Sequence, residues 1–412
     1  MRLDDDATVG ERIAHYRRRR GMTQQVLCGL VGGRSTEWLR QIENGHRDVD
    51  KLSTVVAVAG ALKISPSALL PGPFRARVTG RTTLGTAPDH VPEIEAAMLR
   101  YDGITELIGV PDRPMSPPDH LRLRIERAFV CSQTERWSEM APLIPGMIAD
   151  AWHLVHAAQT EQQRNHAYRL QALVYRVTSG MLDRLGETHL PWVAAERSMY
   201  AAEQTGDQLL IAGGAWRLAV VLRHAGRLLE STDLPIAAAD AIRPTLNEPA
   251  SYSVYGALML KGAVGAATLG DHRAVRDHLA EASRAAEIIG DRNDHWFAFG
   301  PTNVAIHRVW LSLELSDPAR AIEQAAYVAH ENLPDELAER QTSHLITVAW
   351  AHYLRKQDRA ALDALKAARS SAPEQLIFTR RVHSMVRGML RRERRSVKGD
   401  LRELASFVGV AG

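Results

Sequence analysis

Residues 9–70 read VGERIAHYRRRRGMTQQVLCGLVGGRSTEWLRQIENGHRDVDKLSTVVAVAGALKISPSALL, and this stretch indicates how the whole chain is organised. Thr23 belongs to the residue types that cap helix N-termini, and the residues after it predict a short helix over 24–31. The side chains expected to face inward on this helix are Val26, Leu27 and either Leu30 or Val31. Gly32 and Gly33 then provide a turn, because glycine reaches backbone angles that other residues avoid.

A second short helix is predicted after this turn. Ser35 or Thr36 caps it, and it continues through Glu43 with Leu39 and Ile42 buried. Its other face carries Thr36, Glu37, Arg40, Gln41 and Asn44. Arginine pairs well with guanine, glutamine and asparagine pair with adenine, and glutamate accepts from cytosine, so this face suits the base edges of DNA. The two helices therefore have the pattern of a helix-turn-helix motif in which the second is the recognition helix.

The stretch resembles the XRE (Cro/C1-type) repressor family. The residues that carry the resemblance are Ile13, Arg17, Gly21, Met22, Thr23-Gln24, Leu27, Val31-Gly32, Ile42-Glu43-Asn44-Gly45, Ala61-Leu62-Lys63-Ile64-Ser65 and Leu69-Leu70. The resemblance implies a five-helix domain similar to that of lambda repressor, with a buried structural ion pair between Arg17 and Glu43.

The resemblance also implies which side chains contact DNA. It assigns base reading to Thr36, Glu37 and Gln41, with Arg40 beside them, and it assigns contacts to the DNA backbone to Gln24, Asn44, His46 and Lys51. The turn before the second helix is one residue longer than in the short phage repressors, which leaves either Arg34 or Thr36 at the first contact. The DNA-binding candidates are therefore Gln24, Arg34, Ser35, Thr36, Glu37, Arg40, Gln41, Asn44, His46 and Lys51.

Composition and charge predict a globular protein of two or three domains with a basic N-terminal part. The chain has 412 residues, of which 45% are apolar and 24% charged. Residues 1–81 hold 14 Lys and Arg against 8 Asp and Glu, whereas the remainder holds 37 against 40. A basic N-terminal part on a nearly neutral body fits phosphate binding by the former alone.

Cysteine usage and the N-terminus predict a cytoplasmic protein without bound metal or cofactor. The two cysteines, Cys28 and Cys131, form no disulfide framework or metal-binding spacing, and Cys28 is expected in the core. The start is acidic, at Asp4-Asp5-Asp6, unlike a signal peptide, and no apolar run reaches the roughly 20 residues of a membrane span. His153 and His156 lie three residues apart, but no further ligand accompanies them, so they are expected to be surface or packing residues.

The rest of the chain predicts a linker and a helical body. Residues 1–70 form the predicted DNA-binding domain, residues 71–90 a Pro/Gly/Thr-rich linker, and residues 91–412 a helical repeat domain. Residues 91–108 predict a single helix, followed by a proline-rich break at 110–119. The fold expected for the chain is thus all-α, with a helix-turn-helix domain followed by an α-solenoid.

The solenoid is predicted from turns that recur along the body. Turns at 225–227, 269–271, 315–317 and 356–358 are spaced by 41 to 46 residues, and helices with small residues at helical spacing follow them. The body resembles tetratricopeptide repeats, although the spacing exceeds the usual period of about 34 residues. The combined architecture resembles a group of actinobacterial regulators and the peptide-sensing regulators of Gram-positive bacteria, which implies a homodimeric transcriptional regulator bound to an operator in double-stranded DNA.

The repeats are expected to sense a small molecule or a peptide on their inner face. Candidate ligand contacts are Arg217, Tyr255, Trp296, Asn303 and His307. Asn303 and His307 lie one turn apart on a helix that Pro301 begins, and an asparagine can clamp a peptide backbone through its donor and its acceptor. The alternative at this site is that the aromatic residues fill the core between repeats and that Asn303 packs locally.

Two other functions are compatible with the sequence. The repeats could recruit a protein partner without a small ligand, or they could act as a phosphatase-like enzyme on a partner. Against an enzyme, the chain lacks the phosphate loop, GxGxxG, HExxH and GxSxG motifs. The sequence therefore predicts a regulator and no enzyme.

Overall fold

The computed structural model describes residues 8–31, 35–45, 54, 58–59, 61–62, 69, 87–99, 116–328, 337–392 and 397–410. Within these ranges the chain forms helices and turns, and its only extended pairing is an isolated bridge between Arg292 and Phe299, so the all-α prediction is confirmed. The chain divides into two compact units, the head with its main span at Met1–Thr82 and the repeat unit at Thr83–Ala405. Every described helix is too short or too polar to cross a lipid bilayer.

The head contains three short helices whose caps were predictable from local sequence. They are α1 (Val9–Arg19), α2 (Gln24–Leu30) and α3 (Thr36–Glu43). Thr23 and Ser35 each accept a hydrogen bond from the backbone N–H three residues later, as expected of N-caps. At α1, Thr8 and Glu11 satisfy each other's backbone N–H groups in a capping box.

One apolar cluster holds the head together. Its buried members are Ile13, Leu27, Cys28, Val31, Leu39, Ile42, Val58, Ala59, Leu62 and Leu69. The burial of Leu39, Ile42 and Cys28 confirms three predictions, and the last four members show that residues after α3 share this core. Most of the residues expected to form the fourth and fifth helices lie outside the described residues.

One prediction about α2, that Val26 faces inward, is wrong, and the choice between Leu30 and Val31 is decided for Val31. Val26 is 50% exposed and Leu30 is 58% exposed, whereas Leu27, Cys28 and Val31 are buried. A helix of seven residues turns only one narrow face toward a core, and positions 27, 28 and 31 share that face at the spacing i, i+1, i+4. The polar residues around Val26 and Leu30 did not reveal which apolar side chains face outward.

Two predicted boundaries before the repeats also need correction. The 3₁₀ helix η1 (Ala87–His90) lies inside the predicted linker over 71–90, and Ala87 is fully buried against the repeat core. The helix predicted over 91–108 is α7 (Val91–Met98), which ends with Leu99 as its C-cap. Residues 100–115 lie outside the described residues.

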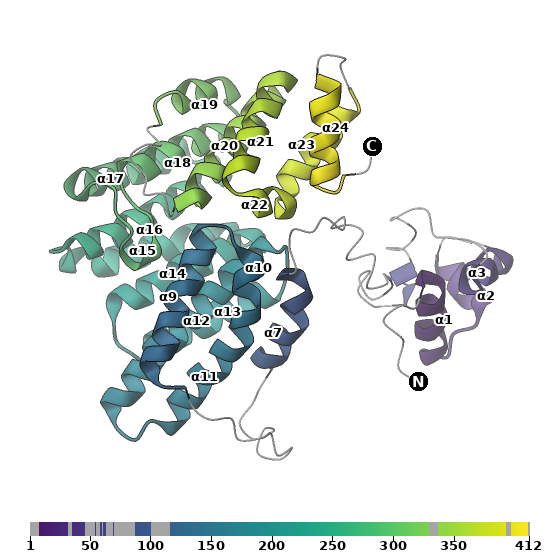
Figure 1. The fold of residues 1–412 in the computed structure, drawn as a ribbon, viewed down its shortest axis with the longest axis horizontal. Helices are drawn as coiled ribbons and strands as arrows, with labels where there is room; N and C mark the ends of the chain where they lie inside the picture. Colours follow the sequence, from purple (N-terminus) through teal and green to yellow (C-terminus); the bar gives the residue numbers. More distant parts are fainter. Residues whose placement is uncertain are drawn as a thin grey trace. The chain divides into compact units, whose positions relative to one another are not determined.

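The repeat unit is a succession of helices in which chain neighbours pack against each other (Figure 1). Its helices are α9 (Pro118–Gln133), α10 (Trp137–Met140), α11 (Ile144–Ala157), α12 (Glu161–Arg184), α13 (Leu190–Glu203), α14 (Gln208–His224), α15 (Leu228–Ile242), α16 (Pro249–Thr268), α17 (His272–Ile289), α18 (Pro301–Glu314), α19 (Pro318–Ala325), α20 (Ala338–Leu354), α21 (Asp358–Ser371), α22 (Pro373–Phe378), α23 (Arg380–Leu390) and α24 (Lys398–Phe407). The one-turn helices η2 (Ala141–Leu143), η3 (Arg243–Thr245) and η4 (Asp294–Trp296) interrupt them. The pairs α12–α13, α14–α15, α16–α17, α18–α19 and α20–α21 form the predicted solenoid.

The recurring turns share one backbone solution. After α14, α16, α18 and α20 the chain places Gly226, Gly270, Ser316 and Lys356 in the left-handed region, with φ between 58° and 77°. The next backbone N–H then bonds the carbonyl five residues earlier, at 2.8–2.9 Å, as in a Schellman motif. After the turns at Gly270 and Ser316, an aspartate caps the next helix, at Asp271 and Asp317. The predicted turns are therefore confirmed at all four places.

Small residues allow the central helices to pack closely. A Cβ atom at Gly256 would lie 1.9 Å from the Phe299 ring, and one at Gly262 would lie 2.2 Å from the Ile236 side chain. These glycines let α16 pack against α15 and against the loop before α18. As a result α16 is buried along nearly its whole length.

The repeat unit also closes on itself. The Ser138 backbone N–H donates to Glu374 at 3.2 Å, and the Arg380 guanidinium donates to the Gly186 carbonyl at 3.0 Å. Gln133 and Asn293 exchange amide hydrogen bonds of 2.8 and 2.9 Å. Helices near the start of the repeats therefore contact helices near their end, in addition to their neighbours in sequence.

Candidate nucleic-acid interface and interior polar cluster

The position of α3 is fixed by apolar contacts and by one buried ion pair. Arg17 Nε and Nη2 donate to the two oxygens of Glu43 at 2.6 and 2.7 Å, and Arg17 Nη1 donates to the Met22 carbonyl at 2.8 Å. The hydrogen bonds that Arg17 donates to Glu43 raise the pKa of Arg17. A bidentate pair of this kind fixes angle as well as distance, so it holds α1 and α3 in register. The predicted Arg17–Glu43 ion pair is confirmed.

Gln24 takes part in the same network. Its Nε2 atom donates to Glu43 Oε2 at 2.8 Å, so the amide that was predicted to clamp a phosphate is bonded inward. In this position Gln24 connects the start of α2 to the end of α3. Its contact with a DNA phosphate remains a prediction, in which the second N–H of Nε2, or the whole amide once released from Glu43, would donate.

The exposed face of α3 carries the predicted base-reading side chains, already bonded to one another. Glu37 accepts two hydrogen bonds of 2.9 Å from Arg40 and one of 3.1 Å from Gln41. The hydrogen bond from Arg40 is the main reason that the pKa of Glu37 is lowered. Because these groups are exposed, they can exchange partners with DNA bases at little cost. The structure thus brings Glu37, Arg40 and Gln41 together, as the resemblance implied.

The other DNA-binding candidates have varied surroundings. Ser35 uses its hydroxyl as the cap of α3, Thr36 is exposed at the first turn, and Asn44 is exposed as the C-cap. Arg34, His46 and Lys51 lie outside the described residues. The sequence prediction did not include Arg18, Arg19 and Arg20, which are exposed at the end of α1 and add positive charge to the head. The run of four arginines at 17–20 was the available signal for them.

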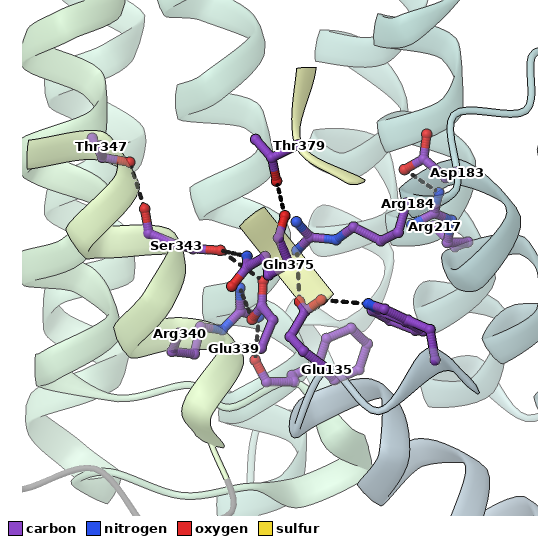
Figure 2. A network of polar contacts seen from close by, with 12 residues as sticks. Glu135, Asp183, Arg184, Arg217, Glu339, Arg340, Ser343, Thr347, Gln375 and Thr379 are labelled. Carbon is purple, nitrogen blue, oxygen red and sulfur yellow. Dashed lines mark hydrogen bonds and ion pairs between the residues drawn. The ribbon is translucent and has the colours of Figure 1, made fainter. Parts of the chain in front are cut away.

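Inside the repeat unit, charged side chains from distant segments form a second polar site (Figure 2). We call it the interior polar cluster, and it consists of Glu135, Asp183, Arg184, Arg217, Glu339, Arg340, Ser343 and Gln375. Arg184 is paired with Glu339 and lies 4.0 Å from Glu135, and Arg340 lies 3.3 Å from Glu339. One arginine on α12 therefore connects the end of α9 to the start of α20.

The two carboxylates beside Arg184 have opposite protonation behaviour. Burial raises the pKa of Glu135 to about 8, because its Oε1 atom has no hydrogen-bond partner and Arg184 compensates it only partly. Arg340 and Arg184 outweigh the burial of Glu339 and lower its pKa to about 2. At neutral pH Glu339 is ionised and binds Arg184, and Glu135 is mostly protonated.

Three predicted ligand residues are engaged in packing or in ion pairs. Arg217 is buried and donates to Ser179 and Asp183 at 2.9 and 2.8 Å. Tyr255 is buried, and its hydroxyl donates to Glu281 at 3.2 Å. Trp296 stacks on Phe129 with ring centroids 4.2 Å apart. These contacts agree with the alternative that aromatic residues at these positions fill the core.

Asn303 and His307 differ from those three residues. Asn303 is 2% exposed, yet its Oδ1 atom has no hydrogen-bond partner among the described residues. His307 Nδ1 donates to the Asn303 carbonyl at 2.9 Å, which leaves Nε2 as an acceptor. Burial and the charges of Lys261 and Arg340 lower the pKa of His307 to about 3, so the ring is neutral at physiological pH.

Lys261, on α16, was not identified from the sequence. Burial and the positive charges of Arg340 and Arg223 lower the pKa of Lys261 to about 7. Its ammonium lies 4.7 Å from the centroid of the Trp216 ring on α14. The sequence KG at 261–262 gives no hint of these neighbours, because they lie on α14 and α20.

A separate hollow lies between α15, α16 and α17. It has a volume of about 450 Å³ and is lined by Thr232, Asp233, Ile236, Ala237, Asp240, Ala266, Leu269, Asp271, Ala274 and His278. No predicted ligand residue lines it. Two of its three acids already have structural partners, since Asp271 caps α17 and Asp240 pairs with Arg243. Among the described residues, no group of three His, Cys, Asp or Glu side chains could hold a metal ion.

Comparison with known proteins identifies the head. Residues 8–70 match the family model of a helix-turn-helix domain. No curated protein matches the chain. Two solved structures are similar: a Rap protein complexed with competence and sporulation factor (11% identity, TM-score 0.43, covering 71% of this chain and 88% of that one), and Bacillus thuringiensis PlcR in complex with the peptide PapR7 and DNA (12% identity, TM-score 0.34, covering 85% and 98%).

Proposed function

Because residues 8–70 form a helix-turn-helix domain, we propose that this chain is a sequence-specific DNA-binding transcriptional regulator of the XRE type. The observation that carries the proposal is the geometry of α3. Leu39, Ile42 and the Arg17–Glu43 pair fix its inner face, so Glu37, Arg40 and Gln41 project from a rigid helix. Rigid presentation of such side chains is what base reading in the major groove requires.

The intramolecular bonds of α3 suggest how discrimination arises. In the free protein, Glu37 neutralises Arg40 and holds Gln41. A cognate site compensates for breaking these bonds by offering a guanine to Arg40, an adenine to Gln41 and a cytosine amine to Glu37. A non-cognate site leaves the carboxylate facing phosphates and unpaired bases, which is unfavourable.

The test separates base reading from backbone contacts. Operator fragments captured from chromatin are footprinted with purified protein, and affinities are measured over a salt series. Gln41→Ala should cost about 1–3 kcal/mol on the operator and relax preference at one base pair, while Gln162→Ala, an exposed change in the repeat unit, should have no effect. An unchanged ratio of operator to scrambled DNA for Gln41→Ala would show that α3 does not read bases.

We also propose that the repeat unit dimerises and senses a small molecule or peptide. A dimer would place two recognition helices about one turn of DNA apart, or a multiple of that spacing. The unpartnered Oδ1 atom of buried Asn303 and the free acceptor of His307 support a ligand site, because buried polar atoms are almost always satisfied. A ligand that prefers one curvature of the repeats would change the spacing of the heads.

Asn303→Ala tests the sensing role. The variant should fold and dimerise as the wild type does, and its operator affinity should no longer respond to culture extract. Sedimentation of wild type and variant tests dimerisation directly, and a monomeric wild type would exclude the homodimer. If wild type responds to no extract but retains a protein from the lysate, the repeats recruit a partner instead.

A further inference from the structure

Lys261 has no counter-ion among the described residues. No carboxylate lies within ion-pairing distance of its ammonium, and its one contact of note is with the Trp216 ring at 4.7 Å. Each of the other positive charges around it, except Arg223, has an acidic partner: Arg217 bonds Asp183, and Arg340 bonds Glu339. A half-buried ammonium without a carboxylate is unfavourable, so its presence calls for a functional reason.

Other unsatisfied groups belong to the same surroundings. Arg223 has its guanidinium 5.6 Å from the Trp310 ring and its Nη2 atom 2.9 Å from the Nε2 atom of His224, and no carboxylate of the described residues pairs with it. The Nε atom of Arg340 is buried without a hydrogen-bond partner. The Lys261 ammonium lies over the Trp216 ring, that ring meets Phe297 with centroids 5.3 Å apart, and Arg340 donates to the Phe297 carbonyl at 3.3 Å, so α14, α16 and α20 meet beside Phe297. Lys261, Arg223 and the Nε atom of Arg340 thus supply more hydrogen-bond donors and more positive charge there than the neighbouring acceptors use.

We propose that Lys261, with Arg223 and Arg340, binds a carboxylate group of an organic effector. The inference rests on the sensing role proposed above and specifies the chemistry of that ligand. Lys261 and the Arg340 Nε atom supply charge-assisted donors for the two carboxylate oxygens. Trp216 and Trp310 supply apolar ring surface for the hydrocarbon part, which favours an organic acid over inorganic phosphate.

A purely structural role for Lys261 gives a different expectation. If the Trp216 contact were its only purpose, the ammonium would lie away from other cations, since a cation–π contact does not require them. Instead the charges of Arg340, Arg223 and Arg217 oppose that of Lys261, and the charge of Glu339 offsets them only in part. An incoming carboxylate would relieve this repulsion and so bind more tightly than to an isolated lysine.

The experiment measures the reactivity of Lys261 in the intact protein. The six lysines of the chain are labelled with trace acetic anhydride and quantified by mass spectrometry, with citrate, inorganic phosphate or sodium chloride at equal ionic strength. Citrate should reduce labelling of Lys261 several-fold and leave Lys356 and Lys366 unchanged, whereas phosphate and chloride should not. Equal labelling of Lys261 in all three salts would overturn the proposal, as would better protection by phosphate.

A matched pair of variants provides a second readout. Citrate should raise the thermal unfolding midpoint of wild type and of Lys366→Met, whose ammonium is 3.2 Å from Asp400, but not that of Lys261→Met. A citrate shift retained in Lys261→Met would overturn the carboxylate site. Random hexapeptide pools with a free or an amidated C-terminus separate the two sources of the group: protection by the free-acid pool alone indicates a peptide, and protection by citrate alone a small acid.

Failure of this inference is distinguishable from failure of the proposed function. If operator affinity responds to culture extract equally in wild type and in Lys261→Met, the sensing role stands and the carboxylate site is wrong. If neither protein responds, the sensing role is wrong, and the labelling result alone decides whether Lys261 binds carboxylates.

Discussion

A single glycine determines how closely α1 approaches α3 in the head. A Cβ atom at Gly10 would lie 1.9 Å from the Ile42 carbonyl oxygen, so no side chain fits there without moving α3. Gly10→Ala should therefore destabilise the head by about 2–4 kcal/mol. Hydrogen exchange of the α1 and α3 amides measures this locally. Gly29→Ala, in open space on α2, is the control and should leave exchange unchanged or slower.

A second prediction for a single residue concerns Lys261 and the way the free energy of unfolding depends on pH. Its pKa is about 7 in the folded protein, below the ordinary 10.5. Below pH 7 the ammonium is therefore charged in both the folded and the unfolded states, and the free-energy cost of burying that charge is fully present. Between pH 7 and 10.5 the unfolded chain binds more protons, and stability rises with pH. Lys261→Met should thus be more stable than wild type at pH 7, by about 2 kcal/mol after allowance for solvent screening.

The comparison across pH checks the cause. Urea unfolding at pH 7 and pH 10 should show the advantage of Lys261→Met shrinking toward zero at the higher pH. The exposed pair Lys366–Asp400 gives the control, since Lys366→Met should change stability little at either pH. An advantage that persists at pH 10 would mean that methionine gains from packing rather than from removal of charge.

Single residues also show which predictions local sequence could support. The caps Thr23 and Ser35 and the first-turn Pro301 depend on neighbours within four residues, and all three are where the sequence predicted them. The surroundings of Lys261 depend on α14, α18 and α20, which no local pattern specifies. The same holds for Arg176, whose guanidinium lies 4.9 Å from the Phe129 ring and donates to the His295 carbonyl.

At the scale of elements, the four recurring turns after α14, α16, α18 and α20 contain two strained residues. Ser316 and Lys356 adopt φ of 64° and 58°, where Gly226 and Gly270 occupy equivalent turns. The left-handed region costs an L-residue roughly 1–2 kcal/mol, so Ser316→Gly and Lys356→Gly should each stabilise the protein by up to about 1 kcal/mol. Thermal unfolding measures the gain. Gly226→Ala, which meets no neighbouring atom, should lose about as much, and a neutral result there would remove strain as the cause.

Elements were predicted unevenly, for a physical reason. Recurring turns leave a strong signal, because a helix must stop where the backbone turns left-handed and the next helix needs a cap. The sequence indicates only weakly which face of a short helix is buried, as the exposed Val26 and Leu30 on α2 show. The helix predicted over 91–108 ends at Met98 with Leu99 as its C-cap, and the apolar spacing that extended the prediction falls on Tyr101 and Leu107, outside the described residues.

At the scale of the whole molecule, Glu135 makes closure of the repeats dependent on pH. Its pKa in the folded protein is about 8 against an ordinary 4.5. Below pH 4.5 the carboxyl group is neutral in both the folded and the unfolded states, so no charge is buried and stability is not reduced. From pH 4.5 to 8 the folded state binds more protons, and stability falls as pH rises. Glu135→Gln should remove this fall and be more stable than wild type at pH 9, by on the order of 3 kcal/mol.

Urea unfolding at pH 5 and pH 9 tests this prediction. The two proteins should differ little at pH 5 and clearly at pH 9. Glu139→Gln, at an exposed carboxylate paired with Arg136, serves as the control and should follow wild type at both values. Parallel behaviour of Glu135→Gln and wild type would show that Arg184 holds Glu135 ionised.

Closure of the repeats has a consequence for how the chain folds. The bonds from Ser138 to Glu374 and from Arg380 to Gly186 join residues 236 and 194 positions apart. An open repeat array folds by adding units to a nucleus and frays from its ends, with contacts that are local in sequence. Here both ends of the array are held, so contact order is higher and loop-closure entropy must be overcome before the last contacts form. The repeats should therefore lose structure together, with no partly unwound state that begins at α23.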